Sequence, residues 1–321
     1  MSARHARWEA QSLVGDGLAA RVLEPSPPAV TDEWMADDPV AAPVPPDRAV
    51  VSPIPGADLT WNEWLAEHPE HAGWAAERWL GAHRRLVRPS APFAATRLAA
   101  HRLAVYVISP ARRRANGKIG LRWTLGGLGT PFYADDEQVR LSGGRLVHQR
   151  GGAARSRPVT TLAAAAAFVL DGEPDRAGAE GFDVPSPGDP DAPLALDADS
   201  MGLLGDWFGF AFSVLEELRA DPVLADPGRV QLWPEHFDAA VDAIVGPAGR
   251  ATFGASPGDA AVDQPYLYVL PPDPGAVTPG ELWNAESFRG AILPLAAFAD
   301  APDQRGAALA FLRGRRAALA G

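Results

Sequence analysis

One short segment of the chain carries the residue types best suited to chemistry. His236 and Asp238 stand two positions apart, so in a β-strand their side chains share one face. A carboxylate beside an imidazole can orient the ring as a general base or as a metal ligand. Trp233 and Glu235 would lie on the opposite face of the same strand. Because no second histidine is nearby, a buried, hydrogen-bonded structural histidine is the simpler interpretation of His236.

A serine lies further along the chain in a glycine-rich turn. Ser256 is the centre of a Gly-x-Ser-x-Gly segment and is followed by Asp259. With His236 as base, this serine could act as a nucleophile whose base is oriented by Asp238 or Asp259. However, Pro257 directly after the serine has no N–H group to contribute to an oxyanion hole. We therefore favour a turn in which Ser256 and Asp259 bind backbone N–H groups.

These residues suit a ligand pocket better than a catalytic site. Ligand pockets combine aromatic walls with a few polar groups, and two tyrosines follow the serine turn closely. We therefore expect a protein that binds a small molecule, and we assign no catalytic residue. The pocket would form where strand ends converge, and it would be lined by Trp233, His236, Asp238, Ser256, Asp259, Tyr266 and Tyr268.

Two other functions remain open from the sequence. The first is a hydrolase or a metal-assisted enzyme that uses His236 together with Asp238 or Glu235. The second is a protein-interaction module that binds its partner through a proline-rich N-terminal arm. We expect no cofactor, and the ligand pocket described above requires no metal ion.

The composition limits these functions. The chain has 321 residues, with 40 Asp and Glu against 29 Lys and Arg, a net charge of −11 and no cysteine. The missing cysteines exclude disulfides, Cys-ligated zinc, iron–sulfur clusters and thiol catalysis. The acidic balance argues against a nucleic-acid partner, because nucleic-acid-binding surfaces are usually basic. The most apolar run, Met201 to Leu215, is too short to span a membrane and contains Asp206, so we expect a cytoplasmic protein without a membrane partner.

Proline spacing and composition divide the chain into regions. Residues 1–58 are rich in proline and are predicted to form an arm without long helices or central strands. Residues 59–321 are predicted to form a single α+β domain in two halves, 59–171 and 199–321. The halves are joined by residues 172–198, where abundant Asp, Pro and Gly predict a long acidic loop with little order. The acidic charge of this loop could neutralise the arginines between Arg84 and Arg122.

Hydrophobic periodicity predicts helices and antiparallel strands in both halves. The strongest helix covers residues 200–219, and within it Gly205, Gly209 and Ser213 recur every four residues and leave a flat strip for another backbone. A helix from Thr96 is expected to stop at Pro110. The fold class is therefore α+β, with an antiparallel sheet or a partly open barrel or sandwich and flanking helices. Strands are predicted at 119–125, 138–141, 145–149, 230–233, 236–245, 250–254 and 266–270, and a last helix at 302–319.

Several of these segments together resemble a known pattern. They run from Gly117 to Leu121, Leu232 to Asp238, Gly254 to Asp259, Tyr266 to Val269 and Gly290 to Pro294, with a helix after the last. In this order they resemble an uncharacterised family of cytosolic proteins from high-GC bacteria. The resemblance covers about residues 60–320. It implies no activity, and it assigns no catalytic residue to any position of this sequence.

Overall fold

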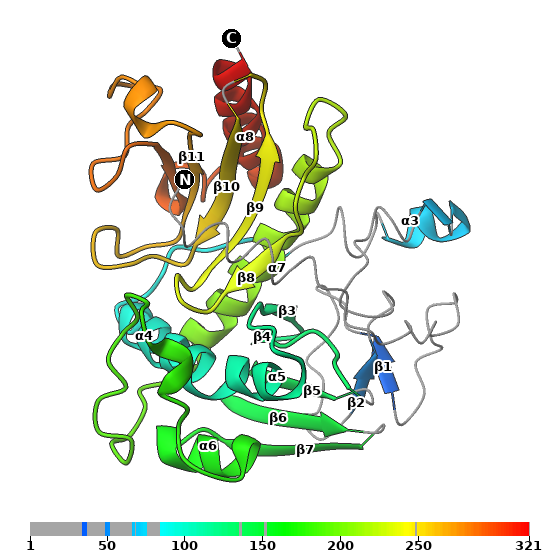
Figure 1. Cartoon of the computed structure of the whole chain (residues 1–321), viewed down its shortest axis with the longest axis vertical. Coiled ribbons are helices and arrows are strands. Elements are labelled where there is room, and N and C mark those ends of the chain that lie inside the picture. Colours follow the sequence, from blue (N-terminus) through cyan, green and yellow to red (C-terminus); the bar gives the residue numbers. More distant parts are fainter. Residues whose placement is uncertain are drawn as a thin grey trace.

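Two five-stranded antiparallel sheets with flanking helices make up the folded part of the chain (Figure 1). Neither sheet closes into a barrel, so the predicted α+β class is confirmed with two open sheets. The structure is a computed structural model, and it describes residues 34–36, 49–51, 66–67, 69–75, 84–134, 137–150, 153–247 and 249–320.

The first sheet is a meander in which each strand pairs with the next one along the chain. The strands predicted at 138–141 and 145–149 are confirmed and form a hairpin, whose turn is made by Gly143 and Gly144, which both have positive φ. Glycine adopts this conformation without a steric penalty, so the turn residues fix the hairpin locally. The strands are β3 (Arg122–Thr124), β4 (Gly127–Gly129), β5 (Gln138–Ser142), β6 (Arg145–Arg150) and β7 (Ala153–Pro158).

The second sheet has the same meander order. Its edge strand meets the edge of the first sheet at Leu121 and Leu232, whose backbones exchange two hydrogen bonds of 2.7 and 2.9 Å. The two sheets are therefore joined edge to edge. The strands of the second sheet are β8 (Gln231–Trp233), β9 (Asp238–Ile244), β10 (Arg250–Ser256), β11 (Tyr266–Leu270) and β12 (Ala291–Pro294).

One long helix, α7 (Ala198–Arg219), packs against both sheets. Its first turn is capped by Asp197, whose carboxylate accepts the N–H of Ser200 at 2.8 Å. The predicted flat strip is confirmed at two glycines. A Cβ on Gly205 would stand 2.9 Å from the backbone of Gly126, and Gly209 lies against the indole of Trp123. The glycines thus bring the helix backbone into direct contact with the first sheet.

The helix that begins near Thr96 does not stop at Pro110, contrary to expectation. α4 (Phe93–Leu103) continues through a π-helical stretch, η3 (Ala104–Ile108), into α5 (Ser109–Asn116). Proline lacks the N–H that would bond to the carbonyl four residues earlier, which belongs to Tyr106. That carbonyl instead accepts the N–H of Asp175 at 2.9 Å. The helix tolerates the proline because another segment supplies the missing donor.

The acidic loop 172–198 is held against this helix, so the expectation of little order is wrong. The Asp175 carboxylate pairs with Arg113 at 2.7 Å, which confirms that acidic residues of the loop neutralise part of the arginine-rich stretch. The Tyr106 hydroxyl donates to the Pro185 carbonyl at 2.8 Å, and the Arg102 side chain donates to the loop backbone. Charged and backbone bonds therefore fix the loop where its sequence offers few large apolar residues. It contains one 3₁₀ turn, η4 (Ala177–Ala179).

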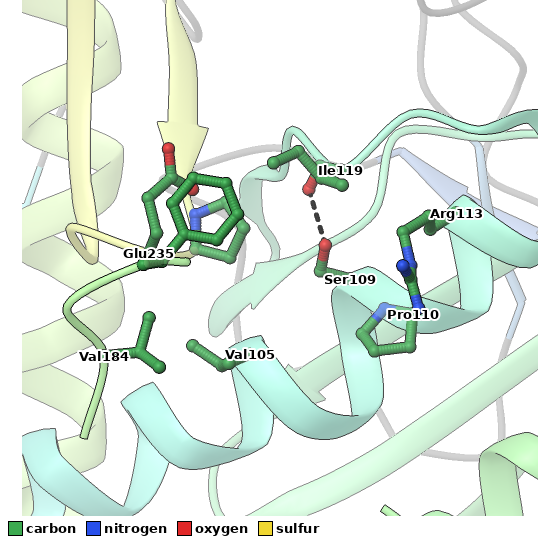
Figure 2. Close-up of a pocket in the computed structure, with 9 residues that line it drawn as sticks. Val105, Ser109, Pro110, Arg113, Ile119, Val184 and Glu235 are labelled. Atoms are coloured by element: carbon green, nitrogen blue, oxygen red, sulfur yellow. Dashed lines mark hydrogen bonds between the residues drawn. The ribbon is translucent and has the colours of Figure 1, made fainter. Parts of the chain in front are cut away.

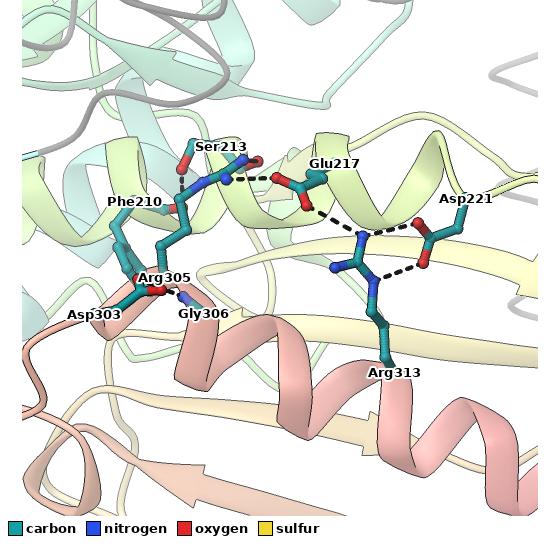
Figure 3. Close-up of polar contacts among 8 residues, drawn as sticks. All are labelled: Phe210, Ser213, Glu217, Asp221, Asp303, Arg305, Gly306 and Arg313. Carbon is teal, nitrogen blue, oxygen red and sulfur yellow. Dashed lines mark hydrogen bonds and ion pairs between the residues drawn. The ribbon is translucent and has the colours of Figure 1, made fainter.

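The last helix, α8 (Gln304–Ala320), lies along α7 and contacts β11 and β12. Figure 3 shows the polar contacts between the two helices. Arg313 binds the Asp221 carboxylate with two hydrogen bonds of 2.8 and 2.9 Å and reaches Glu217 at 3.1 Å. Arg305 pairs with the other oxygen of Glu217. Four charged side chains thus fasten the C-terminal helix to the central one.

The remaining described elements are short. Of the predicted arm, residues 1–58, the described residues include only β1 (Trp34–Ala36) and β2 (Ala49–Val51), which pair in parallel, and the rest lies outside them. None of the described helices combines the length and the apolar character that a membrane crossing requires. The other elements are η1 (Pro69–His71), α3 (Ala72–Ala75), α6 (Leu162–Leu170), η5 (Pro274–Ala276) and η6 (Leu295–Ala297).

Candidate functional site

The segment that the sequence singled out forms a tight turn and not a continuous strand. β8 ends at Trp233, residues 234–237 turn, and β9 begins at Asp238. Phe237 has a φ of 55° and donates its N–H to the Trp233 carbonyl at 2.7 Å. Pro234 has no N–H with which to continue the ladder, so the chain reverses here. The turn overturns the expected shared strand face of His236 and Asp238.

The turn separates this histidine from the carboxylate. His236 is exposed, whereas Asp238 is buried with 5% of its surface accessible. Within the described part of the chain, no hydrogen bond joins the two side chains. His236 still acts on Asp238 through its charge, which favours the ionised carboxylate. The histidine therefore does not form the oriented pair that a general base requires.

Asp238 has a different partner, Tyr268 on β11. The tyrosine hydroxyl donates to Oδ2 of Asp238, across the intervening strand β10. Gly254 is the residue of β10 that faces Tyr268 in the register, and a Cβ there would overlap two ring carbons and the hydroxyl oxygen of the tyrosine. The glycine therefore provides the space in which the ring crosses to the next strand.

Only one of the two carboxyl oxygens of Asp238 has a hydrogen-bond partner among the described residues. Its Oδ1 atom is buried and has no hydrogen-bond partner among the described residues. Burial raises the pKa of Asp238 above its usual range, and the charge of His236 and the bond from Tyr268 oppose this rise. Burial and the neighbouring Asp238 charge also raise the pKa of Tyr268 well above its usual value. A buried oxygen without a donor is rare in folded proteins and indicates a missing partner.

Ser256, Asp259 and Tyr266 form the neighbouring part of the same sheet face, and they bind one another. The Tyr266 hydroxyl donates to Asp259 at 2.6 Å, and Ser256 accepts the N–H of Gly258 at 3.1 Å. The second oxygen of Asp259 accepts the N–H groups of Ala261 and its successor at 2.7 and 2.8 Å. The expected turn chemistry is confirmed. Within the described part of the chain, no hydrogen bond joins Ser256 to a histidine.

The predicted residues come together at one end of the second sheet. In the register Trp233 pairs with Asp238, and Ser256 pairs with Tyr266, so all four side chains share a face. Tyr268 lies on that face one pleat further along, 6.2 Å from Tyr266 between ring centroids. His236 stands at the tip of the turn, and Asp259 lies in the loop that follows β10.

Glu235 is the other buried carboxyl group of this turn, and it lines a small cavity next to the helix that contains the π-helical stretch. Only 6% of its surface is accessible, and its Oε2 atom has no hydrogen-bond partner among the described residues. The cavity has a volume of about 10 Å³. Val105 and Ser109 of the helix and Val184 of the acidic loop also line it (Figure 2). That volume is room for about one water molecule. Burial, together with the charge of Asp238, raises the pKa of Glu235 to about 8.

A second histidine, His101 on α4, contacts two residues of the turn. Its Nε2 atom lies 2.9 Å from the Pro234 carbonyl oxygen, so this nitrogen carries the proton. Its ring stacks on Phe237 with centroids 4.8 Å apart, and burial lowers its pKa to about 4. His101 is therefore neutral near pH 7 and positions the turn. No local motif marks this residue, because its partner lies far along the chain.

An open hollow of about 750 Å³ lies beside the aromatic pair. Its wall residue Phe288 meets the ring of Tyr268 edge-on, with centroids 6.3 Å apart. Asn284 fixes the loop by bonding both the N–H and the carbonyl of Ile292 on β12, at 2.9 and 3.2 Å. Phe288 thus stands between the hollow and Tyr268, the tyrosine that binds Asp238. The residues around it are Pro279, Gly280, Trp283, Asn284, Ala285, Glu286, Ser287, Phe288 and Arg289.

Comparison with known proteins assigns no function to this site. The sequence matches no protein-family model, and no curated protein or solved structure is significantly similar to it. Among the described residues, no three His, Asp or Glu side chains gather in a way that could hold a metal ion. The function must therefore be argued from the site itself.

Proposed function

We propose that the protein binds a small molecule at the end of the second sheet, with Asp238 and Tyr268 as its polar anchor. The observation that carries the proposal is the buried Oδ1 atom of Asp238, which lacks a donor among the described residues while Oδ2 accepts the tyrosine hydroxyl. A ligand that donates a hydrogen bond to Oδ1 would remove the cost of this buried unpaired oxygen. The ligand would therefore carry an ammonium or hydroxyl group.

The residues around Asp238 indicate what the remainder of the ligand would look like. Tyr268, Tyr266 and Phe288 provide aromatic surface near the carboxylate, and Phe288 also lines the open hollow, from which a ligand would approach. Such a site favours a compact ligand with one donor group and one flat or apolar part. A cationic donor is favoured over a neutral one, because a positive charge beside Asp238 stabilises the ionised carboxylate that burial alone disfavours.

Hydrolysis by His236 receives less support. The histidine is exposed at a turn and bonds neither Asp238 nor Ser256 in the described part of the chain, whereas a catalytic base must contact its nucleophile. The proposed role is therefore binding, and the cytoplasmic location expected from the sequence belongs to the same proposal. Partner binding by the N-terminal arm remains a prediction, since nearly all of that arm lies outside the described residues.

A titration with three matched aromatic probes tests the proposal. Phenethylamine, phenethyl alcohol and phenylacetate share one ring and differ in the group offered to Asp238. We expect saturable calorimetric binding of the amine at millimolar concentration, weaker binding of the alcohol and no binding of the carboxylate. Equal binding of all three probes, or binding of none, would overturn the proposal.

Substitutions then locate the binding site. Asp238→Asn and Tyr268→Phe keep the shape of their side chains and should each weaken amine binding about tenfold. Asp242→Asn is the matched control, because Asp242 lies on the same strand but already accepts the Thr252 hydroxyl at 2.6 Å. Phe288→Ala changes only the rim of the hollow and tests access if the buried variants fold poorly. Unchanged affinity in Asp238→Asn and Phe288→Ala would place the amine elsewhere.

A further inference from the structure

β7 forms the outer edge of the first sheet. It pairs with β6 on one side, and the sheet ends there in the described part of the chain. Its residues alternate between exposed and half-buried, so the strand is open to solvent along its length. An edge strand presents N–H and carbonyl groups that can pair with a further strand. Residues 153–157 of β7 therefore have the backbone groups that an added strand needs, whereas Pro158, at the end of the strand, has no N–H to donate.

Two arginines of this strand are held in place by one aromatic ring. The guanidinium carbons of Arg155 and Arg157 lie 5.8 and 5.5 Å from the ring centroid of Phe168 on α6. The two positions are separated by one residue, so both side chains share one face of the sheet. His148, the cross-strand partner of Arg155, meets the same ring edge-on. The cations are thus preorganised on a rigid base.

Neither arginine has a carboxylate partner among the described residues. Arg150, at the end of the neighbouring strand, shows the contrast, because it pairs with Glu137 at 2.9 Å. Glu137 also accepts His148 Nε2 at 2.6 Å, so it is fully engaged. Arg155 and Arg157 are exposed positive charges in a chain whose net charge is −11. Two cations side by side that have no carboxylate partner in the described part of the chain favour an anionic partner.

We infer that β7 is a docking edge for an acidic, extended peptide, which adds to the first sheet as a sixth strand. Residues of an added strand that stand opposite Arg155 and Arg157 point to the same face and alternate in its sequence. The recognised pattern is therefore an acidic residue at every second position. Nucleic acid fits less well, because the two guanidinium groups already cover the Phe168 ring on which a base would stack.

Fluorescence anisotropy with a labelled peptide in which Glu alternates with Val tests the inference. We expect saturable binding to the full chain at low salt. Arg155→Gln combined with Arg157→Gln should weaken it about tenfold. Arg88→Gln, which removes an exposed arginine paired with Asp300 elsewhere on the surface, should leave it unchanged. Circular dichroism of the variants checks that the sheet is intact.

Three further probes separate strand addition from simple charge attraction. A peptide of the same composition with its Glu residues adjacent should bind at least about fivefold more weakly, and so should a peptide N-methylated on alternate residues, which lacks backbone donors. Equal binding of all three peptides would overturn the inference. Tighter binding of a thymidine oligonucleotide than of the alternating peptide, or release of the peptide by inorganic phosphate at low millimolar concentration, would also overturn it.

Discussion

Gly254 lies in the register opposite Tyr268, and its missing side chain is the space that the tyrosine ring occupies. The ring crosses β10 there, and its hydroxyl reaches Asp238 on β9. One glycine thus controls whether the polar anchor of the candidate site can form. The relationship can be tested without knowing the ligand.

Gly254→Ala should lower the free energy of unfolding by about 1–3 kcal/mol, because the new methyl group overpacks against the ring. The same substitution in a Tyr268→Ala background should cost less than about 0.5 kcal/mol, because the clash is gone. Urea unfolding of the four proteins of this double-mutant cycle provides the measurement. Equal costs in both backgrounds would show that the ring does not lie over Gly254.

The buried Glu235 should make stability fall at alkaline pH. Its pKa is about 8 in the folded protein against an ordinary value of 4.5, so between these limits the folded chain holds a proton that the unfolded chain has lost. The free energy of unfolding therefore decreases as pH rises through this window, by up to about 1.4 kcal/mol per pH unit. Glu235→Gln should reduce the decrease between pH 6.5 and 8, because Asp238 is then the buried carboxyl group with a raised pKa that remains in this turn.

His101 also makes stability depend on pH, but only below about pH 6.5. Its pKa of about 4 lies below the ordinary value of 6.5, so its contribution to the free energy of unfolding is lost as pH falls from 6.5 toward 4. The effects of Glu235 and His101 oppose each other between pH 4.5 and 6.5, and only the first acts above 6.5. Urea unfolding of the wild type and of Glu235→Gln at pH 6.5 and 8 therefore measures the effect of Glu235 without that of His101. Parallel changes in the two proteins would contradict the buried, protonated Glu235.

Two glycines of α7 should respond oppositely to alanine. Gly202→Ala should raise the free energy of unfolding by about 0.5–1 kcal/mol, because this position is exposed and alanine is the better helix former. Gly205→Ala should lower it by about 1–3 kcal/mol, because the methyl group meets the backbone of Gly126. Thermal unfolding monitored by circular dichroism compares the two variants directly. Stabilisation by both would mean that α7 stands further from the first sheet.

The arginine contacts between α7 and α8 should show a salt dependence. Arg313→Gln removes the paired bonds to Asp221 and the contact with Glu217, and should cost about 1 kcal/mol of unfolding free energy at low ionic strength. The cost should shrink in 1 M NaCl, where exposed charges are screened. Arg316→Gln, on the same helix, is the matched control and should have little effect. A cost that does not change with salt would assign the role of Arg313 to packing.

Local sequence patterns were sufficient to predict several elements. Two consecutive glycines, Gly143 and Gly144, indicate the turn between β5 and β6, because glycine adopts the positive φ of a tight turn without a steric penalty. The spacing of Gly205 and Gly209 predicts a close backbone contact of α7, although not its partner, which is the first sheet. The ends of β11, Tyr266 and Leu270, agree with the prediction because aromatic and branched residues run up to a proline.

Features that depend on distant segments were not predictable in this way. The helix continues past Pro110 because Asp175, in another segment, bonds the Tyr106 carbonyl. The turn before β9 rests on His101, whose partner Pro234 is more than a hundred residues away in the sequence. The candidate site was predictable only in part. Its residue types were recognisable from the sequence, but the bond between Tyr268 and Asp238 depends on the register of three strands, which the sequence does not specify.

The bridge between Leu121 and Leu232 covers the outer edge of the first sheet next to β3, and it can form only after Leu232 has been synthesised. The first half of the chain is complete well before Leu232 is made, and until then β3 lacks the neighbour that covers its outer edge. Uncovered strand edges favour pairing between different chains. A nascent first half is therefore the form of this protein most exposed to aggregation, and completion of β8 ends that exposure at this edge.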